Sequence, residues 1–270
     1  MPAYTAAGMS GTTTSSLSDL YKVTHTATMG GKLQRNYTVL YDPEMYASYW
    51  VAYPLCATHV TGSGRDECWA YDPDVPNAKQ TNAIPGAYST DFATANYAHN
   101  LYSRGHQIAN ADRNGVDDMC DQTYYMTNIT PQLQYGFNGG VWKDLETAVR
   151  NLTSSCDTVY VVTGAAFRKK GGSETVNTIV NPRDSKTLPI PNYYWKALLK
   201  VTWSGDTVTE ASAIGFWLPH QDLKGASYTS YTVSVDQIET WTGFDLFANL
   251  PVALQSTAET NSNWGTFSSF

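Results

Sequence analysis

Arg104 and His106 are the residues of this sequence whose types and spacing best suit chemistry on a phosphate. They stand in the segment Ser103-Arg-Gly-His-Gln107, and residues two apart point to the same side of an extended chain. A neutral imidazole accepts a proton from water near pH 7, and a guanidinium binds a phosphate through two parallel hydrogen bonds. Gly105 permits close approach of another backbone. The alternative is that His106 is an ordinary polar core residue and Arg104 a surface charge.

Two downstream segments carry further polar residues. One is Thr127-Asn-Ile-Thr-Pro-Gln132, and the other is Phe137-Asn-Gly-Gly-Val-Trp-Lys-Asp-Leu-Glu146. The second runs into a predicted helix over 139–152, where apolar residues recur at helical spacing and mark one buried face. Beside that face, residues four apart form a predicted polar stripe of Asn138, Trp142, Glu146 and Arg150.

The strings R-G-H-Q, T-N-I-T-P-Q and F-N-G-G-V-W-x-x-L-E, in this order, resemble the DNA/RNA non-specific endonuclease family. These ββα-metal nucleases include secreted sugar-non-specific nucleases and mitochondrial endonuclease G. Weaker similarity runs from about Tyr37 to Phe247, and the first 30 or so residues carry none of it. The resemblance implies a ββα-metal finger at the active site, within a larger mixed or antiparallel sheet.

The resemblance also implies a role for each matching residue. His106 matches the general base, and Asn138 matches the side chain that directly ligates a catalytic Mg²⁺, for which Mn²⁺ or another divalent cation can substitute. Glu146 matches an acid that holds metal-bound water, and Asn128 matches a residue that orients the network of the site. The arginines expected to hold phosphate or brace the site are Arg104 and Arg150.

Helix geometry limits how Asn138 and Glu146 can share one metal ion. They are eight residues apart, so at about 1.5 Å rise per residue their Cα atoms are separated by about 12 Å along a straight helix. This distance favours Asn138 as the direct ligand and Glu146 acting through water. A neutral ligand suffices, because Mg²⁺ keeps several waters and takes further oxygens from phosphate.

Two positions depart from the family pattern. Ser103 stands where the family usually has Asp, which removes a carboxylate that would brace the arginine or the loop but leaves the base and the metal ligand intact. A second substrate-binding arginine is expected two residues before a Trp-x-x-Asp-Pro stretch. Arg65 is the candidate, but it precedes Trp69-Ala-Tyr-Asp-Pro73 by four residues.

The sequence therefore predicts a Mg²⁺-dependent endonuclease that hydrolyses phosphodiester bonds in DNA and RNA and, by resemblance, leaves 5′-phosphate ends. Contacts to phosphate and metal instead of base edges predict weak sequence preference. Ser103 suggests an alternative, a catalytically weakened relative that binds nucleic acid or docks a protein inhibitor. The 19 tyrosines and eight tryptophans suggest an extracellular glycan-binding module, but the ordered motifs have no place in one.

Strand-forming runs separated by turn signals predict the scaffold that positions these residues. Ser234-Val-Asp-Gln237 predicts the start of a helix that ends at Gly243. Strands without regular βαβ alternation favour one α+β domain over 31–270, preceded by a flexible segment over 1–30. The stretch from Tyr71 to Ser103 is predicted to be a long loop. The predicted strands are 38–41, 49–53, a central strand at 159–163, 193–203 and 208–218.

Charge and hydropathy restrict the partners of the chain. Its net charge is −7, with 17 Lys and Arg against 24 Asp and Glu, so a nucleic-acid site must depend on local arginines or a metal ion. The basic cluster at 168–170 is either a solvated turn or part of a groove. No run approaches 18 apolar residues, which excludes a membrane-spanning helix.

Four cysteines in no metal-binding pattern predict two disulfides, preferably Cys56–Cys68 with Cys120–Cys156, although free buried cysteines are the alternative. Disulfides, many aromatic residues and few lysines suit an extracytoplasmic protein. The Ser/Thr/Gly-rich stretch at 10–16 fits the remainder of a removed targeting segment.

Overall fold

A seven-stranded antiparallel sheet forms the centre of the protein in the computed structural model, which describes residues 1–4, 17–62, 67–82, 102–181 and 183–270. The strand order is β12-β11-β10-β7-β4-β3-β2, and every neighbouring pair is antiparallel. The strands are β2 (Tyr21–Met29), β3 (Lys32–Asp42), β4 (Ala47–Leu55), β7 (Val159–Ala166), β10 (Tyr193–Ser204), β11 (Thr207–Pro219) and β12 (Thr232–Val233).

The predicted strands are confirmed, because apolar residues fill both faces of this sheet. Strands β3 and β4 are neighbours, and β7 is the fourth of the seven strands, at the centre. Along β4, Val51 and Tyr53 pack into one core, whereas Trp50 and Ala52 pack into another. Such runs are typical of strands that are buried on both sides. The α+β class expected from the sequence is confirmed.

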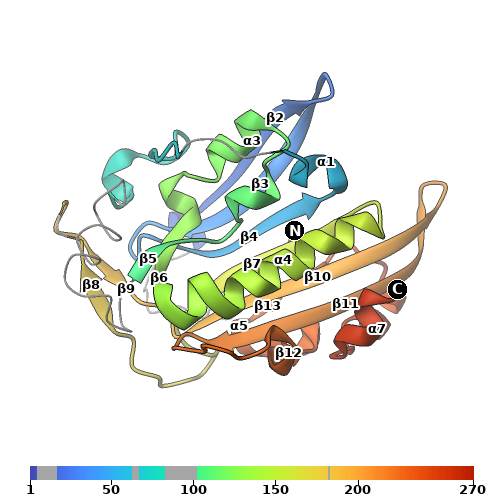
Figure 1. Cartoon of the computed structure of the whole chain (residues 1–270). Coiled ribbons are helices and arrows are strands. Elements are labelled where there is room, and N and C mark those ends of the chain that lie inside the picture. Colours follow the sequence, from blue (N-terminus) through green and yellow to red (C-terminus); the bar gives the residue numbers. More distant parts are fainter. Residues whose placement is uncertain (5–16, 63–66, 83–101, 182) are drawn as a thin grey trace.

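Helices cover each face of the sheet (Figure 1). Helix α4 (Lys143–Asn151) and helix α7 (Trp264–Ser268) contribute Leu145, Val149 and Phe267 to the first core. Helix α5 (Val235–Thr242) and helix α6 (Val252–Ala258) contribute to the second core on the opposite face. Ser234 Oγ accepts a hydrogen bond from the Gln237 amide, and Gly243 ends α5 with a φ of 78°, which confirms the predicted start and end of this helix.

The sheet begins earlier in the chain than the sequence predicted. Residues 21–29 form the edge strand β2, which pairs along its length with β3, so the boundary at residue 31 is wrong for this part of the predicted flexible segment. Strand β1 (Ala3–Tyr4) pairs with β13 (Phe244–Asp245). Residues 5–16 lie outside the described residues.

The predicted helix over 139–152 begins later than expected. Residues 134–142 form a kinked helical segment in which Gly136 has a φ of 70° and Gly140 has φ −125° and ψ −117°. Glycine adopts such angles readily because it has no Cβ. The regular helix α4 starts at Lys143, so the predicted polar stripe is wrong for Asn138, which precedes the kink, and for Trp142, which is fully buried.

Shorter elements complete the described fold. The hairpin of β5 (Tyr102–His106) and β6 (Ile129–Leu133) leads into α4 and gives the expected ββα unit. Strand β5 therefore replaces the predicted loop at its end, while 83–101 lies outside the described residues. Within the described ranges, no helix combines the length and hydropathy needed to cross a membrane. The remaining strands and α-helices are β8 (Thr178–Val180), β9 (Thr187–Pro189), α1 (Ala57–Val60) and α3 (Asp117–Gln122).

The predicted disulfides are wrong, since the four cysteines, all of them described, form none. Cys56 precedes α1, and its sulfur lies 3.5 Å from His59 Nδ1. The sulfur of Cys68 lies 2.8 Å from Asp121 Oδ1, and that of Cys156 lies 3.3 Å from a backbone oxygen. Cys120 is buried on α3. The four thiols therefore contact different neighbours and not one another.

Candidate active site

The β5–β6 hairpin separates the predicted site residues into two sets. Its regular pairing joins Arg104 to Pro131 and His106 to Ile129. Because side chains alternate along a strand, Arg104 and His106 share one face of the hairpin. Ser103 and Gly105 belong to the other face, and both are more buried than their neighbours in β5.

His106 lies in an aromatic environment with one nitrogen available for a new hydrogen bond. Its ring centroid is 5.3 Å from that of Trp69 and 5.3 Å from that of Tyr124. Nε2 is enclosed and has no hydrogen-bond partner among the described residues. Burial lowers the pKa of His106 to about 4, although a hydrogen bond to the Arg104 backbone opposes this shift. The imidazole is therefore neutral at pH 7 and can accept a proton.

Arg104 places a positive charge beside His106. Its guanidinium carbon lies 4.2 Å from the centroid of the Trp69 ring, a cation–π arrangement that fixes the plane of the group. Burial lowers the pKa of Arg104, while the charge of Glu67 raises it. The arginine remains a cation, and the pKa of His106 is also lowered by its charge.

Asn128 fixes the turn that follows His106. This fully buried residue accepts a hydrogen bond from the Ile108 amide at 3.0 Å and donates to the backbone oxygens of Ile108 and Thr123. Its own carbonyl oxygen accepts from the Gln107 amide at 2.9 Å. Each polar atom of its side chain is thus used within the protein, which suits a positioning residue and leaves Asn128 no role in direct contact with substrate.

Asn138, in the segment that follows β6, is held by Ser103 of β5. Its Nδ2 donates to Ser103 Oγ at 2.9 Å and to Gln134 Oε1 at 3.0 Å, while Ser103 Oγ donates to the Gln132 backbone. With the nitrogen held by two acceptors, Oδ1 is the atom of the amide left to bind a cation. Ser103 therefore orients Asn138 and does not brace Arg104, contrary to the expectation for an acid at this position.

Arg150 and Glu146 project from α4 into a second group of polar residues, here named the α4 cluster (Asp112, Glu146, Arg150 and Lys196). Arg150 donates to Asp112 Oδ1 at 2.9 Å and to Thr147 Oγ1 at 3.1 Å. Tyr53 donates to the other oxygen of Asp112 at 2.7 Å. Burial lowers the pKa of Arg150, but the adjacent Asp112 carboxylate more than offsets this effect.

Glu146 and Lys196 complete the α4 cluster. Burial raises the pKa of Glu146 to about 7, and the charge of Lys196 opposes the increase. Lys196 is buried on β10 with its Nζ 4.7 Å from the centroid of the Trp142 ring. Burial lowers the pKa of Lys196, and Glu146 raises it. The two acids of this cluster are thus compensated by two nearby cationic side chains.

The structure brings the predicted residues together in two groups. Arg104 lies with His106, and Glu146 lies with Arg150, while Asn138 contacts Ser103 and makes no hydrogen bond to His106 among the described residues. Arg65 lies outside the described residues, so its predicted role has no structural counterpart here.

Four residues of these groups were missed by the sequence analysis: Trp69, Asp112, Tyr124 and Lys196. Lys196 had a usable signal, because a lysine inside the apolar run from Tyr193 to Leu199 is rare unless it is paired. The sequence analysis used Trp69 only to locate Arg65. Asp112 and Tyr124 carry no local signal, since their partners come from distant parts of the chain.

Gly105 is required by close packing within the hairpin. A Cβ placed on this residue would lie 2.3 Å from Cβ of Gln132, a distance at which two carbon atoms cannot coexist. The approaching group is a side chain of the protein itself and not another backbone. The glycine thus allows Gln132 to cover β5 next to His106.

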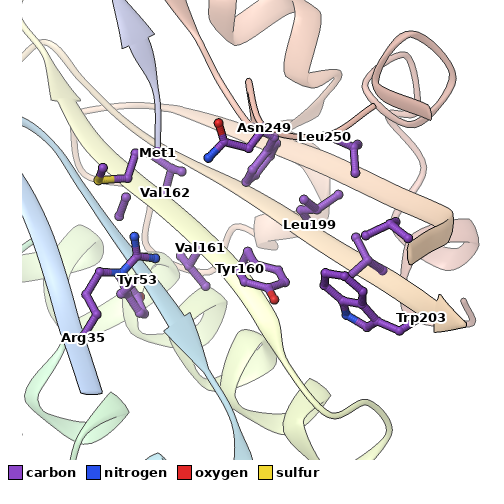
Figure 2. Close-up of a pocket in the computed structure, with 14 residues that line it drawn as sticks. Met1, Arg35, Tyr53, Tyr160, Val161, Val162, Leu199, Trp203, Asn249 and Leu250 are labelled. Atoms are coloured by element: carbon purple, nitrogen blue, oxygen red, sulfur yellow. The ribbon is translucent and has the colours of Figure 1, made fainter. Parts of the chain in front are cut away.

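Neither of the two cavities identified is lined by the predicted site residues. The first, of about 250 Å³, lies over strands of the sheet (Figure 2). Its walls are mainly apolar, with the side chains of Arg35, Tyr160 and Asn249 at its border. The second is bordered by Glu44 and Lys79 near the start of β2. The candidate active site is therefore the hairpin surface and the adjacent end of α4.

The donor atoms of the site fit a hard cation in part. Mg²⁺ binds oxygen ligands and usually takes one or two from protein, and Asn138 offers an oriented amide oxygen. Glu146 adds an acid whose ionisation a nearby cation would favour, since burial disfavours its charge. The Ser103 hydroxyl beside Asn138 is a further neutral oxygen.

Residues 17–253 match the sequence profile of the DNA/RNA non-specific endonuclease family. The chain is 32% identical over 209 residues to a nuclease of Serratia marcescens, covering 77% of this chain and 71% of that protein. It is 28% identical over 172 residues to the mitochondrial endonuclease G of Homo sapiens, covering 62% of this chain and 54% of that protein. The crystal structure of an EndoG/EndoGI complex shares the fold, with a TM-score of 0.59 and 23% identity, covering 86% of this chain and 89% of that chain.

Proposed function

The chain belongs to the DNA/RNA non-specific endonuclease family, and from this premise we propose that it hydrolyses phosphodiester bonds with His106 as the general base. The observation that carries the proposal is a neutral imidazole with an enclosed Nε2 that has no partner among the described residues, beside an arginine. A base of this kind is ready to bond to a water and remove its proton at neutral pH.

His106 takes a proton from the water that attacks phosphorus, and its hydrogen bond to the Arg104 backbone holds the ring as Nε2 accepts it. The pKa of about 4 means that the imidazole is already unprotonated at pH 7. Removal of bulk water by a bound substrate strengthens the charge interactions around the imidazolium that forms. Asn128 keeps the ring in position through the turn at Gln107 and Ile108.

Arg104 binds the phosphate oxygens on the same face of the hairpin. Its stacking on Trp69 restricts the guanidinium, so less conformational entropy is lost when two parallel hydrogen bonds form. Arg150 is already paired with Asp112, so it braces α4 and contributes positive charge at longer range. Arg104 is thus the arginine that binds substrate, and Arg150 is the arginine that positions α4.

Asn138 would hold the divalent cation, Mg²⁺ or a substitute such as Mn²⁺, through Oδ1, with Ser103 and Gln134 orienting the amide. Glu146 would act on water bound to the ion. When bound, such a cation neutralises phosphate oxygens and stabilises a leaving oxygen. Its presence would also favour the ionised form of Glu146, whose pKa burial raises to about 7.

The proposed substrates are both DNA and RNA, with 5′-phosphate ends on the products. Contacts directed at phosphate carry little sequence information. The net charge of −7 makes local cations necessary, so binding should weaken steeply with salt and depend on the metal ion. An extracytoplasmic location and a protein inhibitor are further proposals. The predicted disulfides no longer support the location, and the names of several relatives place those proteins in mitochondria.

Nicking of a supercoiled plasmid tests the proposal. The wild-type chain with Mg²⁺ should nick the plasmid, a chelator should abolish nicking, and His106→Ala should lower the rate by about 10²–10⁴-fold, the usual contribution of a general base. End analysis of the products should find 5′-phosphate. Lys32→Ala, which removes an exposed cation at the start of β3, is the control for nonspecific loss of charge.

Two outcomes would contradict the proposal. An unchanged rate for a folded His106→Ala variant would remove the imidazole from the reaction. A folded wild-type chain that binds the plasmid but leaves it intact with both Mg²⁺ and Mn²⁺ would identify the catalytically weakened relative. Thermal unfolding of each variant verifies the fold.

A further inference from the structure

Three carboxylates converge where α5 meets the end of α6, and they are named here the α5 acid cluster (Asp236, Glu239 and Glu259). Asp236 and Glu239 are three residues apart on α5 and therefore share one side of the helix. Glu259 directly follows α6. One carboxylate oxygen from each residue lies within 4.8 Å of the others.

Glu259 is the residue that distinguishes this cluster from an ordinary acidic surface. Its side chain is only 2% exposed, and its Oε1 has no hydrogen-bond partner among the described residues. A buried acceptor without a partner is unfavourable, and more so when it is charged. A hydrogen bond with Gln255 acts on the same carboxyl group, so Oε1 is the atom at which a proton or a cation is needed.

Among the described residues, no salt bridge compensates the cluster, since none involves Asp236, Glu239 or Glu259. Burial, together with neighbouring carboxylates, raises the pKa of Glu239 to about 7 and that of Glu259 to about 8. The Leu246 amide donates to Glu239 Oε1 at 2.6 Å, which satisfies one oxygen only.

The number of carboxylates in the cluster fits calcium better than magnesium. Ca²⁺ takes six to eight oxygen ligands in a flexible geometry and often binds several carboxylates, whereas Mg²⁺ keeps several waters and usually binds one or two. Three carboxylates whose oxygens lie within 4.8 Å of one another thus suit calcium, and water would complete its coordination.

We propose that Asp236, Glu239 and Glu259 bind a calcium-sized divalent cation that joins α5 to the C-terminal segment of the chain. The site is separate from the proposed nuclease site, because α5 and α6 pack on the face of the sheet opposite α4. The Asp236 amide already donates to the Glu259 backbone oxygen at 3.3 Å. The ion would strengthen this junction and stabilise α6 against the sheet.

Calcium binding to the full chain, in the absence of nucleic acid, tests the proposal. At pH 8, millimolar Ca²⁺ should raise the melting temperature by several degrees and give a saturable heat in titration calorimetry, while Mg²⁺ should do so more weakly. Glu259→Gln should abolish both responses and Glu239→Gln should weaken them. Glu210→Gln, an exposed acid-to-amide change on β11, should respond like the wild type.

Absence of a calcium-dependent shift and of binding heat in the wild type would overturn the proposal. A chain that is insensitive to Ca²⁺ but gains stability when the pH falls from 8 to 6 would show that protons occupy the cluster instead. Equal responses of Glu259→Gln and the wild type would place the ion elsewhere and overturn the assignment. None of these readouts uses nuclease activity, so the outcome is independent of the proposed function.

Discussion

The α4 cluster and the α5 acid cluster lie on opposite faces of the sheet. They differ in whether positively charged side chains lie near the buried carboxylates. In the α4 cluster, Arg150 binds Asp112 and Lys196 lies near Glu146. In the α5 acid cluster, the charged groups that act on Glu259 are other carboxylates, and a hydrogen bond with Gln255 opposes them only in part. Burial raises the pKa of an acid in both places, to about 7 for Glu146 and to about 8 for Glu259.

This difference shows that a raised pKa alone does not define the role of an acid. In the first cluster, cationic side chains compensate both acids, and Asp112 is held as part of the scaffold. In the second, the part of the chain that the structure describes offers no ion pair, so the proposed source of positive charge is a proton or a metal ion from solution. Removing an acid should therefore have opposite consequences on the two faces.

Asp112→Ala should give the largest effect and tests the scaffold role of the α4 cluster. The change leaves Arg150 and the Tyr53 hydroxyl without their buried acceptor, so the free energy of unfolding should fall by about 3–5 kcal/mol. Urea unfolding measures the loss. Asp157→Ala, which removes an exposed acid, is the control. A loss below about 1 kcal/mol would mean that the two faces do not differ in the way described.

Ser103→Asp adds an uncompensated acid beside Asn138. If missing positive charge is what attracts a divalent ion, the new carboxylate should lower the Mg²⁺ concentration for half-maximal plasmid nicking by about tenfold, the usual scale for residues that support a metal ligand. Ser103→Asn adds volume without charge and is the matched control. An unchanged Mg²⁺ requirement in Ser103→Asp would count against Asn138 as the metal ligand.

The pH dependence of Glu146 should change the free energy of unfolding by about 2–3 kcal/mol between pH 5 and pH 8. Its pKa is about 7 in the folded chain and 4.5 ordinarily. The folded state therefore binds more protons than the unfolded state between these values, and its free energy of unfolding falls as the pH rises through this range. Urea unfolding at pH 5, 6, 7 and 8 should show that, as the pH rises, the wild type loses stability relative to Glu146→Gln. Parallel curves would indicate that Lys196 and Arg150 cancel the effect of burial.

The sequence was sufficient for those parts of the fold that depend on local patterns. Apolar runs predicted the central strand at Val159, and Ser234 and Gly243 predicted both ends of α5. The start of α4 was misplaced because apolar spacing continues through Gly139 and Gly140, whose backbone the pattern does not constrain. The edge strand β2 has an alternating, half-exposed pattern, which the sequence analysis did not recognise as a strand. The expectation that the first 30 or so residues carry no family similarity is wrong for β2, because the family match begins at residue 17.

The candidate site was predictable in its residue types but not in its geometry. The R-G-H-Q motif identified Arg104 and His106, and strand alternation correctly predicted that they share a face. The same alternation places Ser103 on the other face, but its pairing with Asn138 depends on the kink between β6 and α4. Asp112 depends on Tyr53 and Arg150, which are distant in sequence, so its role follows only from the folded chain.

The contact between Gly105 and Gln132 limits how this protein can diverge. Every single-base change of a glycine codon that alters the amino acid introduces at least a Cβ, which the hairpin has no space to receive. A lineage therefore cannot leave glycine at this position in one step unless residue 132 has first become glycine, because every other residue keeps the Cβ atom that faces Gly105. The order in which these two codons change is imposed by the distance between two strands.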